Sequence, residues 1–299
     1  MHPQEQHATE ERQHRLEEEA DVVRRRSRWA GLAALAAVLA AVSVAVGGAT
    51  AGNNAANPLR LNSTGTLVVG MNLQYPPQMY LDKNGNPAGY DVMMLKALAK
   101  QMKVKLKIQN LDFNGLIPGL VSKKFDMVSV GLTATPERKK AISFSRPYVP
   151  YAQVLAVRPD DTTPATIAAW NSSDKTITSL QGSTAEQRVQ SQFPNAASKS
   201  FPDQNAAFLE VATGRADAIV VENYLVAQFN KSNPGNKLKL APFKRPLTVE
   251  YGSWAVQKGN TPLAGYLSKF ICKAQNNGTL GRFYQKAEGT PLPPMPRCK

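Results

Sequence analysis

From residue 66 onward, the chain alternates short apolar runs with segments whose hydrophobic residues recur at helical spacing. Apolar runs at 66–70, 104–108 and 127–130 predict strands, and the second run alternates with lysines, which indicates one solvent-facing side. Helical spacing behind Asp91 predicts a helix at 92–102, and a second helix is expected at 115–122. Strands that alternate with helices in this way are typical of an open α/β sheet with crossover helices.

A second set of the same elements follows a polar loop at 158–164. Here apolar runs predict strands at 176–180 and 218–221, and helical patterns predict helices at 186–193 and 204–213. β-rich stretches at 148–157 and 247–256 flank the set, and the helices expected at 263–275 and 279–286 have no strands of their own. We therefore expect an α/β protein with a first lobe at 65–148, a second lobe at 149–248 and a return to the first lobe at 249–299. Open α/β sheets bind ligands at their strand ends, so a cleft is expected between the lobes.

A leader precedes these lobes. Four arginines at 24–28 stand before the apolar run Trp29–Val46, and Ala49-Thr50-Ala51 follows it. This order is typical of an export signal, which assigns 1–51 to a signal peptide and 52–64 to a linker. The apolar run is also long enough for an uncleaved membrane anchor, so both interpretations remain open. Either one predicts an exported protein, in the periplasm or the cell envelope.

Charge and residue content narrow the function. The formal net charge is +14, and residues 52–299 hold 30 Lys and Arg against 15 Asp and Glu. These lysines are scattered without a nucleic-acid-binding module, which favours a solvated basic surface over nucleic-acid binding. His2, His7 and His14 all lie in the leader, so the exported part has no imidazole for Ser-His-Asp catalysis, Cys-His catalysis or metal binding. We expect no cofactor and no metal.

The two cysteines, Cys272 and Cys298, both lie near the C-terminus. In a chain that enters an oxidising compartment, two such cysteines are expected to pair. The disulfide would hold the Pro-rich tail against the helix predicted at 263–275, and closing this loop would stabilise the fold by about 3 kcal/mol.

Several motifs occur in a characteristic order between about residues 66 and 289. They are Val69-Gly70-Met71-Asn72 with Tyr75-Pro76-Pro77, then Gly89-Tyr90-Asp91-Val92, Asp112-Phe113-Asn114-Gly115-Leu116-Ile117-Pro118, Gly131-Leu132-Thr133-Ala134-Thr135-Pro136-Glu137-Arg138 and Arg215-Ala216-Asp217-Ala218-Ile219-Val220-Val221-Glu222. In this order and spacing they resemble the bacterial extracellular solute-binding proteins of family 3, the polar amino-acid-binding proteins of ABC importers, and within that family the chain is similar to glutamine-binding protein. The resemblance implies a periplasmic-binding-protein-like type II fold, in which two α/β lobes joined by two hinge strands close on a ligand.

The resemblance also implies a site for the carboxylate of an amino acid. It assigns the carboxylate to Arg138, whose planar guanidinium can donate two parallel hydrogen bonds. Gly131 and Thr133 would add contacts at the same edge, and Ser183 and Thr184 would face them at a helix start, where free amides favour an anion. Without the resemblance, Arg138 reads as a solvated arginine, and Ser183 and Thr184 as ordinary helix caps.

The remaining site residues would hold the ammonium group and the side chain. Glu222 stands where the family usually has an aspartate for the ammonium; as an alternative it caps a helix that begins at Asn223. Tyr75 and Phe113 match positions whose rings sandwich the ligand, although bare sequence would place them in the core. Asn72 stands where binders of basic amino acids tend to carry an acid, so we expect a neutral polar L-amino acid.

The sequence therefore predicts a non-enzymatic, monomeric binding protein that delivers an amino acid to the permease of an ABC importer. One alternative is a dehydratase of the cyclohexadienyl or arogenate type on the same fold, with Glu222 as a buried general acid. Another is a membrane-tethered sensor or adhesin domain, which an uncleaved leader would favour.

Overall fold

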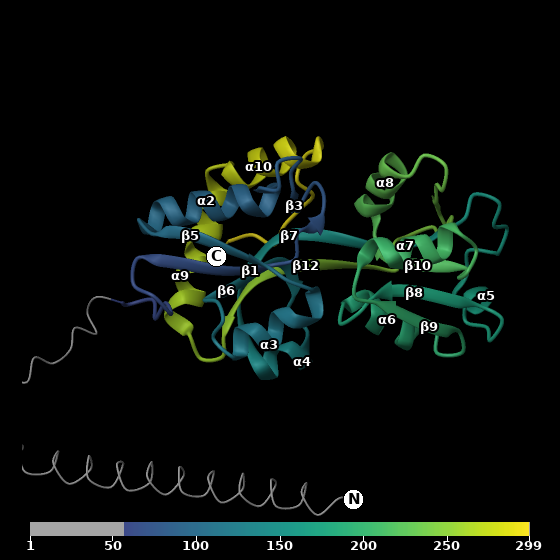
Figure 1. Cartoon of the computed structure of the whole chain (residues 1–299), viewed down its shortest axis with the longest axis horizontal. Coiled ribbons are helices and arrows are strands. Elements are labelled where there is room, and N and C mark those ends of the chain that lie inside the picture. The colour runs from purple at the N-terminus through teal and green to yellow at the C-terminus, as the bar shows by residue number, and fades with distance from the viewer. Residues whose placement is uncertain (1–56, 299) are drawn as a thin grey trace, which may run out of the picture. The chain divides into compact units, whose positions relative to one another are not determined.

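The computed structural model describes residues 57–298, which form two α/β lobes joined by two long strands (Figure 1). The predicted leader at 1–51 with its apolar run Trp29–Val46, the first residues of the linker and Lys299 lie outside the described residues. Within 57–298, no helix combines the length and the apolar character needed to cross a membrane.

Lobe 1 contains both ends of the described chain (Figure 1). Its elements are β1 (Thr66–Met71), β2 (Gln74–Tyr75), β3 (Met79–Leu81), β4 (Pro87–Ala88), α2 (Tyr90–Met102), β5 (Lys105–Asn110), the 3-10 turn η2 (Phe113–Gly115), α3 (Leu116–Val121), β6 (Met127–Thr133), α4 (Pro136–Ala141), α9 (Thr261–Asn276) and α10 (Thr279–Glu288). Strands β5, β1 and β6 are parallel neighbours, and β2, β3 and β4 form a small separate sheet. Of the two C-terminal helices, α10 packs against α2, and α9 packs against the strand that follows α4.

In the sequence, lobe 2 lies between the two long strands that join the lobes. Its elements are α5 (Ile167–Trp170), β8 (Thr176–Leu180), α6 (Thr184–Gln192), β9 (Ala197–Phe201), α7 (Gln204–Ala212), β10 (Ala218–Glu222), α8 (Asn223–Ser232) and β11 (Lys239–Leu240). Strands β10, β8 and β9 are parallel neighbours. A cluster around the fully buried Trp170 and Phe193 packs on one side of these strands.

The joining strands are β7 (Ile142–Val157) and β12 (Thr248–Gln257). They pair with each other in antiparallel register from Ile142 opposite Gln257 to Gln153 opposite Thr248. In lobe 1 β12 pairs with β6, and in lobe 2 β7 pairs with β10. One hydrogen-bonded sheet in the order β5-β1-β6-β12-β7-β10-β8-β9 therefore runs through both lobes, which fixes the strand ends of one lobe opposite those of the other.

Large buried side chains in the core of lobe 1 fix the positions of β7 and β12 relative to α9. Trp254 of β12 and Tyr148 of β7 are fully buried with ring centroids 5.0 Å apart. The Trp254 indole also lies 5.9 Å from the ring of Phe270 on α9, which covers the strands. Apolar residues at helical spacing on α9 and alternating residues on the strands meet in this contact, so the return of the chain to lobe 1 is driven by burial of large side chains.

The predicted disulfide is confirmed, since Cys272 on α9 is bonded to Cys298 in the tail. Arg146 adds a second attachment, because its Nη2 donates to the carbonyl of Pro296 at 2.7 Å. At the other end of the described chain, Leu61 is buried and the backbone N–H of Asn62 donates to Asp126 at 2.5 Å. Residues that the sequence assigned to the linker thus pack against lobe 1.

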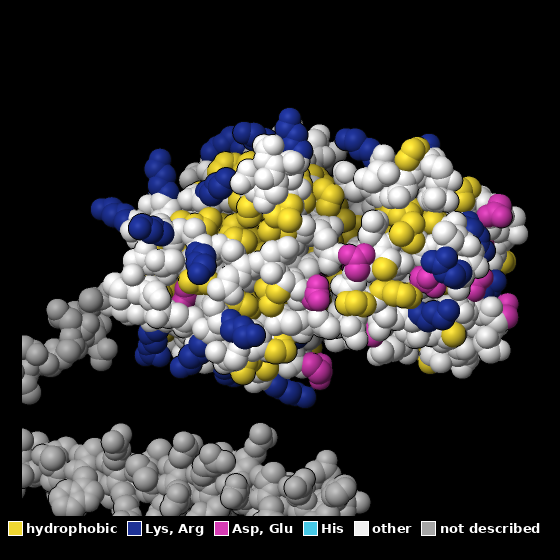
Figure 2. Space-filling view, in the orientation of Figure 1, with side chains coloured by type: hydrophobic (Ala, Val, Ile, Leu, Met, Phe, Trp, Pro, Cys, Tyr) yellow, Lys and Arg dark blue, Asp and Glu magenta, His cyan; other side chains and the backbone are white. Residues whose placement is uncertain are grey.

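The basic surface is unevenly distributed. Figure 2 shows most Lys and Arg side chains of the visible face on lobe 1, whereas Asp and Glu side chains gather at the middle and on lobe 2. On this face, the positive charge is therefore concentrated on lobe 1.

Candidate functional site

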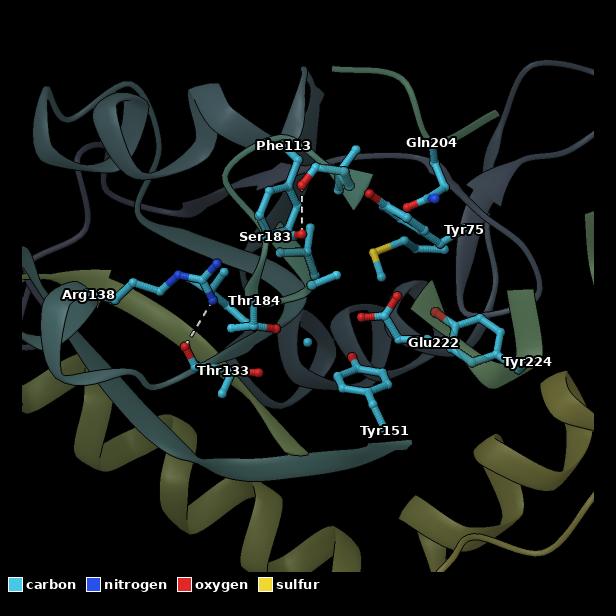
Figure 3. A pocket seen from close by; sticks show the side chains of 16 residues that line it. Tyr75, Phe113, Thr133, Arg138, Tyr151, Ser183, Thr184, Gln204, Glu222 and Tyr224 are labelled. Atoms are coloured by element: carbon cyan, nitrogen blue, oxygen red, sulfur yellow. Dashed lines mark hydrogen bonds between the residues drawn. The ribbon is translucent and has the colours of Figure 1, made fainter. Parts of the chain in front are cut away.

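A pocket lies between the lobes, at the strand ends of both (Figure 3). Lobe 1 contributes Tyr75, Met79, Phe113, Val130, Gly131, Leu132, Thr133 and Arg138, β7 contributes Tyr151, and lobe 2 contributes Leu180, Ser183, Thr184, Ala185, Gln204, Glu222 and Tyr224. Eight of the nine residues that the sequence nominated for ligand binding line this one pocket, and Asn72 is the exception.

Arg138 forms one wall of the pocket and is 7% exposed. It lies on α4, whose start is capped by the Thr135 hydroxyl, which accepts from the Arg138 backbone N–H. Its Nη1 donates to the carbonyl of Thr133 at 3.1 Å, and its Nη2 donates to the carbonyl of Gly182 in lobe 2 at 2.9 Å. A guanidinium has five N–H donors, so three remain for a ligand.

Arg138 stays positively charged although it is buried. Burial lowers the pKa of Arg138 to about 10, while the nearby carboxylate of Glu250 acts in the opposite direction. The guanidinium therefore stays positively charged at neutral pH. Cζ of the Arg138 guanidinium also lies 5.7 Å from the centroid of the Phe113 ring, so a cation–π interaction stabilises the charged form.

The start of α6 faces Arg138 across the cleft. Ser183 is the N-cap of this helix, since its hydroxyl accepts from the backbone N–H of Glu186 at 3.1 Å. The capping role that the sequence left open for Ser183 is therefore real, and it coexists with a place in the pocket lining. The first N–H groups of a helix have no carbonyl partner within the helix, so those of Thr184 and Ala185 favour an anion at this edge.

Glu222 lies on the opposite side of the pocket from Arg138 (Figure 3). It occupies the N-cap position of α8, yet its side chain makes no capping hydrogen bond. Burial raises the pKa of the Glu222 carboxyl, and the negative charge of Glu250 raises it further, while a hydrogen bond with Gln153 opposes the shift. A half-buried carboxylate that does not cap its helix is suited to a positively charged group of a ligand.

Aromatic rings form much of the remaining wall. Tyr75, Phe113, Tyr151 and Tyr224 all line the pocket, and the last two have ring centroids 6.4 Å apart. Gly131 leaves room for one of them, since a Cβ there would lie 1.2 Å from the Tyr151 hydroxyl, and its φ of 60° is unfavourable for other residues. The glycine in the motif is therefore required by the close approach of β7.

Two polar side chains at the end of the pocket away from Arg138 each have a buried atom without a hydrogen bond. Among the described residues, the Tyr75 hydroxyl and Nε2 of Gln204 are buried without a hydrogen bond. Their residues are 6% and 5% exposed, and Figure 3 shows both at the side of the pocket away from Arg138. Buried polar groups are normally hydrogen-bonded, so these two atoms mark a place where a ligand's polar group fits.

Asn72 supports this end of the pocket from behind. Its Nδ2 donates to the carbonyl of Leu111, and its Oδ1 accepts from Gln74 at 2.7 Å. The Gln74 Oε1 in turn accepts from the backbone N–H of Gln204 at 2.9 Å. Asn72, which the sequence nominated for direct contact with a ligand, does not line the pocket. Both ends of its amide are hydrogen-bonded within lobe 1, to Gln74 and to the backbone before Phe113.

Several contacts join the lobes besides that of Arg138. Asn114 donates to Gln181 at 3.0 Å, and the Tyr224 hydroxyl donates to Gln78 at 3.0 Å. The structure is thus a closed arrangement.

Among residues 57–298, no group of three or more Asp, Glu, Cys or His side chains is placed to hold a metal ion.

Comparison with known proteins agrees with this architecture. Residues 67–290 match the model of the bacterial extracellular solute-binding proteins, family 3, and the chain belongs to this family. ABC transporter arginine-binding protein 1 of Escherichia coli (strain K12) is 31% identical over 220 residues, which cover 73% of this chain and 86% of that protein.

Solved structures show the same fold. An ancestral arginine-binding protein bound to glutamine is 33% identical with a TM-score of 0.70, and the match covers 76% of this chain and all of that one. The ancestral amino-acid-binding protein AncCDT-1, a precursor of cyclohexadienyl dehydratase, is 33% identical with a TM-score of 0.68, covering 75% of this chain and 95% of that one. The predicted fold class, a type II periplasmic-binding-protein-like fold, is confirmed.

Proposed function

We propose that the protein captures a neutral polar L-amino acid by closure of its two lobes and delivers it to the permease of an ABC importer. The observation that carries this proposal is the placement of a buried guanidinium and a half-buried carboxylate, Arg138 and Glu222, on opposite sides of one interlobe pocket. A zwitterion carries the two complementary charges. Its contacts with both lobes would stabilise the closed state, and no catalytic step is needed.

Each end of the zwitterion has a matching set of groups. The carboxylate would accept from the free N–H groups of Arg138 and from the first amides of α6, beside Gly131 and Thr133. The ammonium would lie against Glu222 and the faces of Tyr75 and Phe113. Micromolar affinity needs about 8 kcal/mol, which the two charge contacts and a buried side chain would have to supply after the costs of ordering and desolvation.

The preference for a neutral side chain rests on how the acids of the pocket are used. Glu222 faces the ammonium, and Glu250 already accepts from Thr133, Thr184 and Arg188, so neither carboxylate is available to a cationic side chain. The unpartnered Tyr75 hydroxyl and Gln204 amide suit a carboxamide or hydroxyl group. The ancestral arginine-binding protein bound to glutamine shows that a relative of this kind accepts a neutral polar amino acid.

Isothermal titration calorimetry of the full chain, purified and freed of bound ligand, tests the proposal. We expect glutamine, asparagine or serine to bind at least about tenfold more tightly than arginine, lysine or histidine. Tight binding of arginine with no response to neutral amino acids would overturn the ligand class and leave the binding function. Release of an aromatic product from prephenate or arogenate would instead support the dehydratase alternative. No response to any amino acid would refute the proposed function.

A further inference from the structure

Glu250 connects both lobes from the strand that joins them. It lies on β12, opposite Tyr151 of β7, and its side chain is 10% exposed. Its Oε2 accepts from the hydroxyl of Thr133 at the end of β6 and from the hydroxyl of Thr184 at the start of α6, both at 2.8 Å. Its Oε1 accepts from Nη2 of Arg188, one turn further along α6, at 3.3 Å. One carboxylate thus receives donors from lobe 1 and lobe 2.

These contacts occupy the two threonine hydroxyls. A hydroxyl has a single hydrogen to donate, so Thr133 and Thr184 cannot donate to a ligand while they donate to Glu250. The Thr184 hydroxyl also accepts from Nε2 of Gln153 at 2.9 Å, so its hydrogen and one of its two lone pairs are used within the protein. At this edge of the pocket, the protein therefore already supplies a carboxylate of the kind that an amino acid would bring.

We propose that Glu250 stabilises the closed arrangement of the lobes before any ligand is bound, by joining Thr133 of lobe 1 to α6 of lobe 2. Hydrogen bonds to an ionised group are stronger than those between neutral groups, and the small exposure of this carboxylate limits their screening by water. Glu250 is a positioning residue in this role. The ligand then adds to an equilibrium that Glu250 has already shifted toward the closed state.

The inference extends the proposed function, because it concerns the equilibrium on which the ligand acts, but it does not depend on which ligand binds. Other interlobe contacts, such as those from Asn114 and Tyr224, link one lobe directly to the other. Glu250 differs because it stands on the joining strand itself and pairs with donors on each side. Its removal should therefore change closure without removing the charge that the ligand carboxylate needs, which is that of Arg138.

Distance measurements between spin labels test the proposal. Labels attached at Glu137→Cys in lobe 1 and Gln190→Cys in lobe 2 occupy exposed positions on α4 and α6. In the full chain freed of ligand, we expect a substantial population at the short, closed distance. Glu250→Ala should lower the ratio of closed to open molecules by about tenfold or more, since it removes hydrogen bonds to a charged group. Glu250→Gln should give an intermediate ratio, because it keeps an acceptor for the hydroxyls and loses the charge opposite Arg188.

Glu210→Ala is the matched control, since Glu210 pairs with Arg215 at 2.7 Å within lobe 2 and should leave the distances unchanged. Thermal unfolding of each variant shows that it is folded. A ligand-free wild type that is entirely open, or a Glu250→Ala protein with the wild-type distribution, would overturn the inference. If glutamine fails to restore the closed distance in Glu250→Ala while the ligand-free distributions differ as expected, the proposed ligand fails and the role of Glu250 stands.

Discussion

Replacement of Arg138 by lysine isolates the contribution of the guanidinium geometry from that of its charge. Arg138 uses one N–H on the carbonyl of Thr133 and one on that of Gly182, and it packs over the Phe113 ring. A lysine keeps the positive charge but has a compact ammonium, which cannot hold these carbonyls and also grip both oxygens of a carboxylate. We therefore expect Arg138→Lys to lose one charge-assisted hydrogen bond to the ligand.

The loss of one such bond corresponds to about 1.5 to 3 kcal/mol, which is about a 10- to 150-fold weaker affinity. Calorimetry with the preferred amino acid measures it, and thermal unfolding without ligand shows whether the variant folds. Lys139→Ala is the control, because Lys139 is the next residue of α4 and is exposed. An unchanged affinity in Arg138→Lys would refute the assignment of the ligand carboxylate to this guanidinium.

Three further outcomes are expected. Replacing Cys272 and Cys298 by serine removes the cross-link between residues that are 26 apart in the sequence. The free energy of unfolding should fall by about 3.5 kcal/mol, and the Tm measured by calorimetry should fall by about 7 °C. A reductant should lower the wild-type Tm similarly and leave the Tm of the variant unchanged. Burial raises the pKa of the Asp91 carboxyl from 3.8 to about 6, so the folded protein binds this proton more tightly and loses about 3 kcal/mol of stability as pH rises through that range; Asp91→Asn should remove that part of the pH dependence of urea unfolding. Because burial raises the pKa of Glu222 and only its charged form attracts an ammonium, ligand affinity should fall on acidification at a higher pH than for an exposed glutamate, and Glu222→Gln should bind weakly with no such dependence.

The order of the elements could be predicted from the sequence because most of them bury one clear face. The apolar runs at 176–180 and 218–221 correspond to β8 and β10, and the helix expected at 204–213 is α7. Strand β9 gave no signal, since its residues Ala197–Phe201 lie at the edge of the sheet and are exposed or half-buried. An edge strand is stabilised by its neighbour's backbone, which no hydrophobic pattern records.

The candidate site divides in the same way. Residues inside motifs, such as Arg138 and Thr133, could be nominated because the resemblance assigned them to the ligand, and they line the pocket. Gln204 and Glu250 carried no such signal. The first lies at the start of α7 and the second within a β-rich stretch, and their importance comes from partners more than 60 residues away in the chain. Only the folded structure brings those partners together.

The continuous sheet has a mechanical consequence for the movement of the lobes. Strands β7 and β12 remain hydrogen-bonded from one lobe to the other, and their register is irregular only around Gly252, Ser253 and Ala255. At that point, a Cβ on Gly252 would lie 2.5 Å from the carbonyl oxygen of Gly131, so two backbones are in direct contact. If the lobes separate, this pair of strands would have to twist or bend near that contact of β12 with β6. Under the proposed function, opening the cleft would work against the stiffness of that pair, so the rate of ligand release would depend on the backbone as well as on the ligand.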